Sequence, residues 1–146
     1  MNFFEAIASG FRNYVNFSGR AQRSAYWYWA LYTVVASFIG GIMDGTLFPN
    51  SDISPIGTLV SLSLLLPSLA VGVRRLHDID RSGWWLLISF VPFAGFVVLL
   101  VFFCQEGNSG PNQYGPNPLA PHEGTQTEWT QAQTEEFKRS MNLPRE

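Results

Sequence analysis

The chain has 146 residues, enough for one domain, but its composition is not that of an ordinary soluble domain. Apolar residues make up 47% of it and charged residues only 14%, against roughly 25% charged in a typical globular protein. A net charge of -2 does not provide the basic surface that nucleic acid requires, so we expect no nucleic-acid partner. The single cysteine, Cys104, excludes an internal disulfide and a multi-cysteine metal site.

The N-terminal segment, about residues 2–17, predicts an amphipathic helix. Asn2, followed three residues later by Glu5, is typical of a helix start with a capping pair. The apolar residues recur at helical spacing and are rich in phenylalanine: Phe3, Phe4, Ile7, Phe11, Tyr14 and Val15. We expect this helix to lie flat in the cytoplasmic interface of a membrane. The alternative is that its aromatic face packs on a neighbouring helix.

Three long apolar stretches follow, at about residues 24–43, 56–73 and 84–104. Each has about the 20 residues that a helix needs to cross roughly 30 Å of hydrocarbon. Inside a soluble protein such helices would have to be covered on every side, and the rest of the chain is too short to do so. The predicted fold class is therefore all-α: a polytopic membrane helical bundle with three transmembrane helices after the interfacial helix.

Prolines interrupt two of these spans. Pro67 removes the hydrogen bond to the carbonyl of Ser63, so we expect a kink that nearby serines compensate. Pro92 and Gly95 interrupt the third span near its middle. A kinked crossing and a re-entrant hairpin both fit this break, and a broken helix at this depth can also line a binding site.

Small residues on the first span predict a helix-packing face. They form two overlapping pairs at a spacing of four residues, Ala36 with Gly40 and Ser37 with Gly41. Such pairs allow close helix approach in lipid. The partner helix would come from this chain, from a second copy in a homo-oligomer or from another membrane protein.

Basic residues predict the orientation of the spans. Arginines lie before the first span and between the second and the third, whereas residues 44–55 have none. The N-terminus is therefore expected in the cytoplasm and residues 44–55 on the other side. Three crossings would then place the C-terminus in the periplasm.

Five of these arginines predict a cationic collar for anionic lipid headgroups: Arg20, Arg23, Arg74, Arg75 and Arg81. The alternative is a positively charged loop with its own ion pairs, in which Arg74 meets Asp78 and His77 meets Arg81 four residues along a helix. Catalysis or metal binding by His77, Asp78 and Asp80 is a third reading, but these are too few ligands by themselves.

Aromatic residues follow two of the arginines in the same order, in Arg23-Ser24-Ala25-Tyr26-Trp27 and in Arg81-Ser82-Gly83-Trp84-Trp85. Rings of this kind fix the depth at which a chain enters the membrane. Four of them are therefore predicted as interfacial anchors: Tyr26, Trp27, Trp84 and Trp85.

The character of the chain changes after Cys104, where glycine, proline and asparagine leave room for turns only. We therefore predict a membrane domain over residues 1–118 and a flexible polar tail over residues 119–146. Within that tail, Thr125 and Glu128 predict the capped start of a short helix.

Several of these motifs together resemble a known family. They are Phe17-Ser18-Gly19-Arg20, Arg23, Tyr26-Trp27, Arg74-Arg75-Leu76-His77-Asp78, Arg81-Ser82-Gly83-Trp84-Trp85 and Gly115-Pro116. The chain is similar in them to bacterial inner-membrane proteins grouped as a domain of unknown function, number 805. The likeness covers about Phe3 to Pro118 and implies a small multi-span inner-membrane protein. It implies no activity, catalytic residue or ligand.

We therefore expect a non-enzymatic membrane module that contacts lipid or partner helices, with no cofactor. The alternative is a subunit of a small oligomeric transporter or channel in which Pro67 and Pro92 line the path. No charged residue lies in any span core, which leaves such a path without the usual ion-coupling group. An intramembrane enzyme lacks a convincing nucleophile and base.

Overall fold

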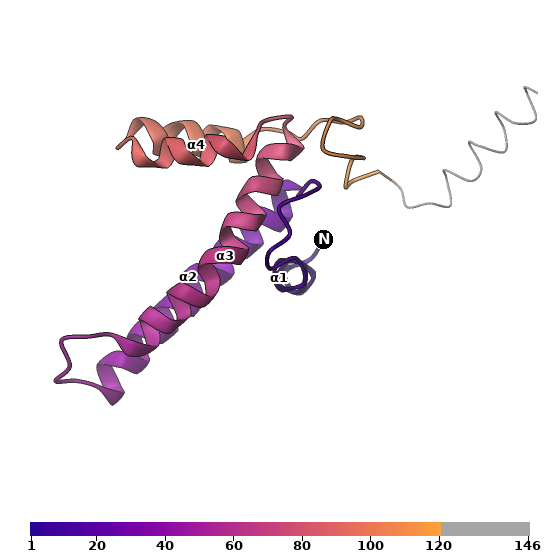
Figure 1. Cartoon of the computed structure of the whole chain (residues 1–146). Coiled ribbons are helices and arrows are strands. Elements are labelled where there is room, and N and C mark those ends of the chain that lie inside the picture. Colours follow the sequence, from indigo (N-terminus) through magenta and orange to yellow (C-terminus); the bar gives the residue numbers. More distant parts are fainter. Residues whose placement is uncertain (121–146) are drawn as a thin grey trace, which may run out of the picture.

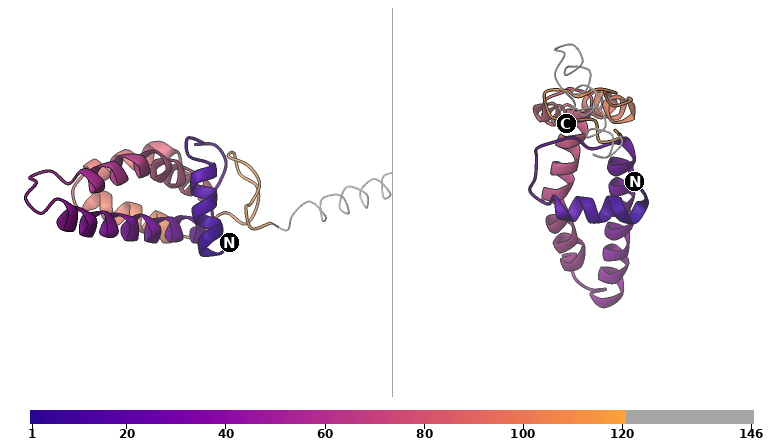
Figure 2. Two further views of the ribbon diagram at one scale, coloured as in Figure 1. Left: turned by 90° about the horizontal axis from the view of Figure 1, so that it is seen from below. Right: turned by 90° about the vertical axis from the view of Figure 1, so that its right-hand side faces the viewer.

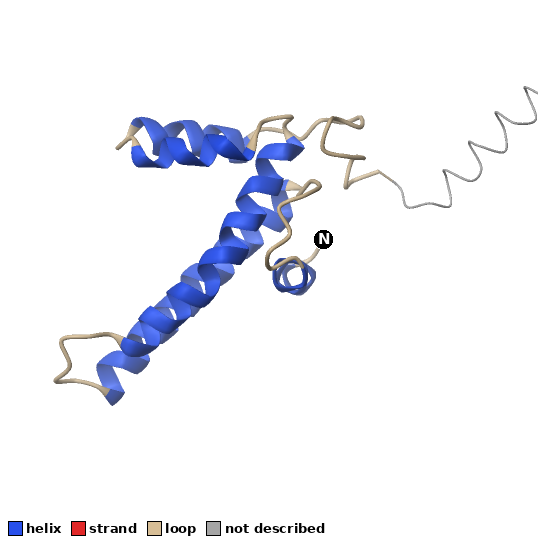
Figure 3. Ribbon diagram, in the orientation of Figure 1, coloured by secondary structure: helices blue, strands red, loops and turns tan. Residues whose placement is uncertain are grey.

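The computed structural model describes residues 1–120, which form helices and no strand beyond an isolated bridge between Asn112 and Gly115 (Figure 1; Figure 3). The elements are α1 (Phe3–Arg12), α2 (Arg23–Leu47), α3 (Pro55–Asp78), the 3-10 helix η1 (Gly83–Phe90) and α4 (Ala94–Cys104). The flexible tail predicted over residues 119–146, with its short helix, lies outside this range except for residues 119 and 120.

Helices α2 and α3 run side by side in opposite directions and are long and apolar enough to cross a membrane (Figure 1). Their 25 and 24 residues give lengths of about 36–38 Å at about 1.5 Å per residue. Only 11% of the most apolar stretch of α2 and 28% of that of α3 are buried within the protein. In water these exposed apolar faces would be strongly unfavourable, so lipid is the solvent that suits them.

Small residues bring α2 and α3 close together toward the end that carries the connecting loop. Gly40 is buried, and a Cβ atom placed on it would lie 3.5 Å from the Cα of Gly57 in α3. Ala36 packs against the buried cluster of Trp29, Leu64 and Val71. The partner of this half of the predicted packing face is therefore α3 itself. Ser37 and Gly41, the other half, are exposed on the outer side of α2.

Asp44 closes the end of the α2–α3 pair that carries the connecting loop. Its Oδ1 accepts a hydrogen bond from the amide of Ile56 at 2.9 Å, and its Oδ2 accepts one from Gly57 at 2.7 Å. These amides belong to the first turn of α3, which has no helical partners for them and carries the positive end of the helix dipole. A buried carboxylate thus caps α3 from the preceding helix.

Helix α1 begins as predicted, with the side chains of Asn2 and Glu5 forming a reciprocal capping box, but it ends at Arg12. It lies crosswise over α2 and α3 (Figure 2). The ring of Phe11 meets that of Trp29 edge-on at 5.2 Å, and a Cβ atom on Gly10 would lie 2.2 Å from the same indole. The alternative expectation, packing on a neighbouring helix, is therefore what the structure shows.

The carbonyl that Pro67 leaves without a helical partner is satisfied from outside α3. Tyr14, just after α1, donates its hydroxyl hydrogen to the Ser63 carbonyl oxygen. Two of the serines expected in this role bond elsewhere: Ser63 Oγ donates to the Val60 carbonyl, and Ser68 Oγ accepts from the Trp29 indole. The segment after α1 thus supplies the hydrogen bond that Pro67 removes from α3.

The expected third span, residues 84–104, is interrupted where Pro92 and Gly95 predicted a break. Two short helices, η1 and α4, are separated by a turn in which Phe93 has a φ of 59°, a conformation unfavourable for a bulky residue. A Cβ atom on Gly95 would lie 1.8 Å from the carbonyl oxygen of Ile88, so the two helices approach closely at the turn. At about 16 Å each, neither is long enough to cross roughly 30 Å of hydrocarbon.

The hairpin returns the chain to the end of α3 from which it left (Figure 1). The amide of Asn108, after α4, donates to the carbonyl of Asp78 at 2.9 Å. The segment after α4 therefore lies at the same end of the α2–α3 pair as residues 17–23. This arrangement fits the hairpin alternative, and the third crossing, with the periplasmic C-terminus predicted from it, is not confirmed.

Candidate functional site

A buried cluster of three charged side chains lies at the end of α3 opposite the connecting loop. Asp78 accepts hydrogen bonds from both arginines: Oδ1 accepts from Arg20 Nε at 2.9 Å, and Oδ2 accepts from Arg75 Nη1 at 2.8 Å. The side chains of Arg20, Arg75 and Asp78 are 1%, 0% and 4% exposed. Burial of two guanidinium groups is tolerable because one carboxylate pairs with both.

Backbone carbonyls satisfy the remaining guanidinium donors of this cluster. Arg20 donates to the carbonyls of Asn108 at 2.5 Å and Gly110 at 2.7 Å. Arg75 donates to those of Phe103 and Gln105, at and just after the C-terminal turn of α4. The C-terminal end of a helix carries partial negative charge, which suits a cation. The cluster therefore ties residues 17–21, α3 and the segment after α4 together.

The collar of five headgroup-facing arginines needs correction. Arg20, Arg74 and Arg75 are turned into the protein, and Arg74 Nε donates to the Ala70 carbonyl within α3 at 3.3 Å. Buried guanidinium groups that already bond to the protein cannot present a cationic surface to lipid. Arg23 and Arg81 alone among the five are exposed.

The two exposed arginines have different surroundings. Arg23 lies 3.5 Å from Glu106, in an exposed pair that is worth little in water. The Arg81 guanidinium lies over the rings of Trp85 and Phe102, at 5.9 and 5.5 Å from their centroids. Their contact with headgroups stays a prediction.

The pairs expected along α3 do not form as predicted. Asp78 bonds to Arg75, three residues earlier, and to Arg20 rather than to Arg74. His77 Nδ1 lies 3.1 Å from the carbonyl oxygen of Gly19, and the ring stacks on Tyr114 at 3.7 Å with an angle of 2°. Since a carbonyl only accepts, Nδ1 carries the hydrogen and Nε2 is the acceptor of the neutral ring.

Tyr114 and Asn112 were not foreseen as partners of His77. Asn112 donates from its side chain to the His77 carbonyl at 2.8 Å, and its backbone pairs with Gly115. Gly115 has a φ of 129°, which favours glycine. The glycine, proline and asparagine residues after Cys104 predicted turns here, but they do not say which element a turn would contact.

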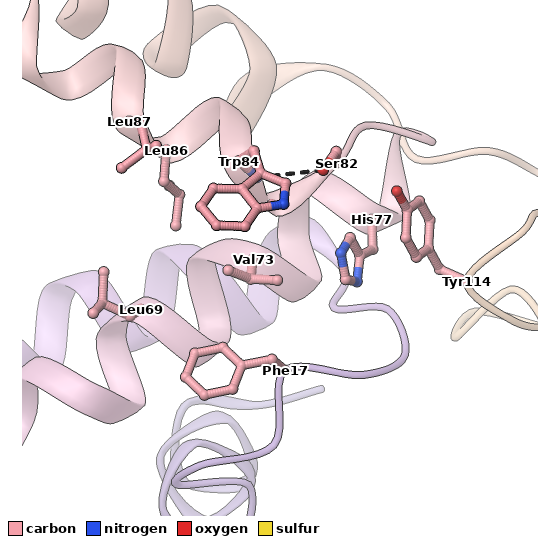
Figure 4. Close-up of a pocket in the computed structure, with 10 residues that line it drawn as sticks. Phe17, Leu69, Val73, His77, Ser82, Trp84, Leu86, Leu87 and Tyr114 are labelled. Atoms are coloured by element: carbon pink, nitrogen blue, oxygen red, sulfur yellow. Dashed lines mark hydrogen bonds between the residues drawn. The ribbon is translucent and has the colours of Figure 1, made fainter.

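A pocket of about 420 Å³ lies beside His77, between α3 and η1 (Figure 4). Its walls are apolar, and the polar side chains that line it gather at one end: His77, Ser82 and Tyr114. Its volume falls within the range of small-molecule sites. The remaining residues that line it are Phe17, Leu69, Val73, Gly83, Trp84, Leu86 and Leu87.

Three of the four predicted aromatic anchors are exposed. Trp27 and Trp85 are 40% and 39% exposed, and Trp84 is 78% exposed. Tyr26 instead packs on Phe103 of α4, with ring centroids 4.2 Å apart. Trp27, Trp84 and Trp85 thus have the exposure that anchors need, whereas Tyr26 joins the spans to the hairpin.

The structure gives the catalytic or metal-binding reading of the polar loop no new support. Asp78 uses both carboxylate oxygens on arginines, and Asp80 is exposed. Among residues 1–120, no three histidine, cysteine or acidic side chains gather closely enough to hold a metal ion.

Comparisons with known proteins place the chain among inner membrane proteins. The family described as Protein of unknown function (DUF805) matches residues 14–116. The chain is similar to the inner membrane protein YhaI of Escherichia coli (strain K12), with 48% identity over 73% of this chain and 89% of the relative. It is also similar to the inner membrane protein YhaH of the same strain, with 40% identity over 73% and 90%. No solved structure matches it.

Proposed function

The chain belongs to the family described as Protein of unknown function (DUF805), and from this premise we propose that it is a non-enzymatic, lipid-contacting module of the inner membrane. The observation that carries the proposal is the arginine cluster around Asp78, which holds the hairpin crosswise at one end of two exposed apolar helices. Such an arrangement offers a large apolar surface to one leaflet.

The proposed topology has two crossings and one hairpin that enters the membrane and returns. Arginines before α2 and after α3 lie at one end of the pair, and residues 48–54 at the other lack basic residues. The positive-inside rule assigns the arginine end to the cytoplasm. Residues 105–120 are then cytoplasmic together with the N-terminus, which replaces the periplasmic C-terminus expected from three crossings.

Headgroup contact is proposed for the exposed charges and rings at this end. Arg23 and Arg81 would meet anionic phosphates, each contributing about 1 kcal/mol near an anionic surface. Trp27, Trp84 and Trp85 would lie at the same depth, with their indole N–H groups toward water and their rings in hydrocarbon.

Quenching of tryptophan fluorescence by brominated lipids tests this contact in bilayers that contain the full chain. We expect brominated phosphatidylglycerol to quench more than brominated phosphatidylcholine at equal mole fraction. The double variant Arg23→Gln, Arg81→Gln should lose this excess, because it removes the charges of the two arginines proposed to contact headgroups.

Glu106→Gln is the matched control, since it also removes one charge from this surface but leaves Arg23 without its exposed partner. The excess quenching by the anionic lipid should persist or increase in this variant. Equal quenching by the two lipids in the unmodified protein would contradict the proposed function.

A further inference from the structure

We infer that the pocket between α3 and η1 holds one acyl chain of a membrane phospholipid, with its headgroup at His77, Ser82 and Tyr114. This inference rests on the proposed function, because it needs α3 to be surrounded by lipid. It goes further by naming a discrete site and the chemical class that occupies it.

The walls of the pocket suit a hydrocarbon chain. Leu69 and Val73 of α3 form one side, and Leu86 and Leu87 of η1 form the other (Figure 4). The pocket volume of about 420 Å³ is ample for part of a flexible acyl chain. Water is poorly stabilised between such apolar walls, because a buried water molecule needs polar groups to hydrogen-bond with.

The position of the pocket on a membrane-spanning helix identifies its occupant. Leu69 and Val73 belong to the apolar stretch of α3, and Leu69 and Leu87 are 41% and 53% exposed at the mouth of the pocket. In a bilayer the medium outside that mouth is acyl chains, so a lipid tail reaches the pocket without crossing water. A soluble apolar ligand would first have to partition into the same lipid.

The polar end of the pocket suits a phospholipid headgroup. Tyr114 lies against the His77 ring with its hydroxyl on the side of Ser82 (Figure 4), so two hydroxyl donors are available to phosphate or ester oxygens. The His77 Nδ1–H bonds to Gly19, which leaves Nε2 to accept from a hydroxyl or ammonium group of the headgroup. None of the 10 lining residues carries a carboxylate that would repel a phosphate.

Native mass spectrometry of the full chain, released from bacterial membranes in mild detergent, tests the inference. We expect the protein to retain one phospholipid under activation that strips the others. Leu69→Trp should abolish this retention, because the indole would fill the pocket. Leu65→Trp is the matched control: it makes the same change one turn away on α3, at an exposed leucine that does not line the pocket, and should retain the lipid.

Tyr114→Phe tests the headgroup end separately, since it removes a hydroxyl and keeps the ring stacked on His77. Loss of one hydrogen bond to the lipid should lower its retention about fivefold. Three results would overturn the inference: no phospholipid retained by the unmodified protein, detergent only in its place, or equal retention by the Leu69→Trp and Leu65→Trp variants. A protein that keeps the anionic-lipid excess in the quenching experiment but retains no phospholipid would disprove the pocket and leave the proposed function standing.

Discussion

At the scale of single residues, Asp78 determines how the end of α3 is built. A sequence with Arg74, Arg75 and Asp78 close together indicates an ion pair but not which arginine forms it. The structure pairs Asp78 with Arg75 and with Arg20, which lies 58 residues away. Helical spacing gives no information about a partner so distant in sequence, and so the burial of Arg20 was not predicted.

Asp78→Asn should destabilise the protein strongly, because it leaves two buried guanidinium groups without an anion. Removal of one partner from a buried ion pair typically costs about 3–5 kcal/mol. The measurement is unfolding of the purified protein in detergent followed by circular dichroism.

The exposed pair of Arg23 with Glu106 provides the comparison for that variant. Glu106→Gln removes an exposed carboxylate and should change the stability by about 1 kcal/mol or less. Equal losses from Asp78→Asn and Glu106→Gln would show that the Asp78 cluster does not carry the stability assigned to it.

At the scale of elements, the beginning of α1 and the two long spans could be predicted, because capping pairs and apolar length are local signals. The break at Pro92 was also evident. The sequence did not show whether this break produces a kink or a hairpin, because the same proline and glycine are compatible with both. The choice depends on the fit of Gly95 against Ile88 and on the bonds from Arg75 to α4, which are tertiary contacts.

The contact of Tyr14 with Ser63 bears on the transport alternative. If Pro67 lined a transport path, the carbonyl that it leaves unpaired in α3 would face the solute. That carbonyl, of Ser63, instead accepts a hydrogen bond from Tyr14. No contact among the described residues favours a path along Pro67, and transport stays an untested alternative.

Gly95→Ala should open the hairpin. The added Cβ atom would lie 1.8 Å from the Ile88 carbonyl oxygen, which belongs to the backbone and cannot rotate away. Overpacking of this kind costs about 1–3 kcal/mol. Hydrogen exchange of the η1 and α4 amides measures the opening, and we expect faster exchange in this hairpin than in α2.

Gly41→Ala is the control for the hairpin variant. A Cβ atom there meets nothing within 4 Å, so the substitution should leave the hairpin unchanged and stabilise α2 by up to about 1 kcal/mol. If both variants exchanged like the unmodified protein, close packing at Gly95 would not hold the hairpin.

At the scale of the whole molecule, two long apolar helices are tied to a hairpin that returns to the end of α3 from which it left. Composition and apolar length were sufficient to predict a helical membrane protein. They were not sufficient to predict the path of residues 84–104, because length alone counts these residues as a span. The tertiary bonds of Arg20 and Arg75 bring the segment after α4 back to the N-terminal loop.

Cysteine labelling in spheroplasts tests this topology most directly, with Cys104→Ala as the background and a maleimide that does not cross membranes. Asn50→Cys, in the loop between α2 and α3, should be labelled in intact spheroplasts. Ser18→Cys and Gln113→Cys should be labelled only after lysis, because the hairpin returns the chain to the side of the N-terminal loop. Labelling of Gln113→Cys in intact spheroplasts, with Ser18→Cys still protected, would contradict the hairpin and restore a third crossing.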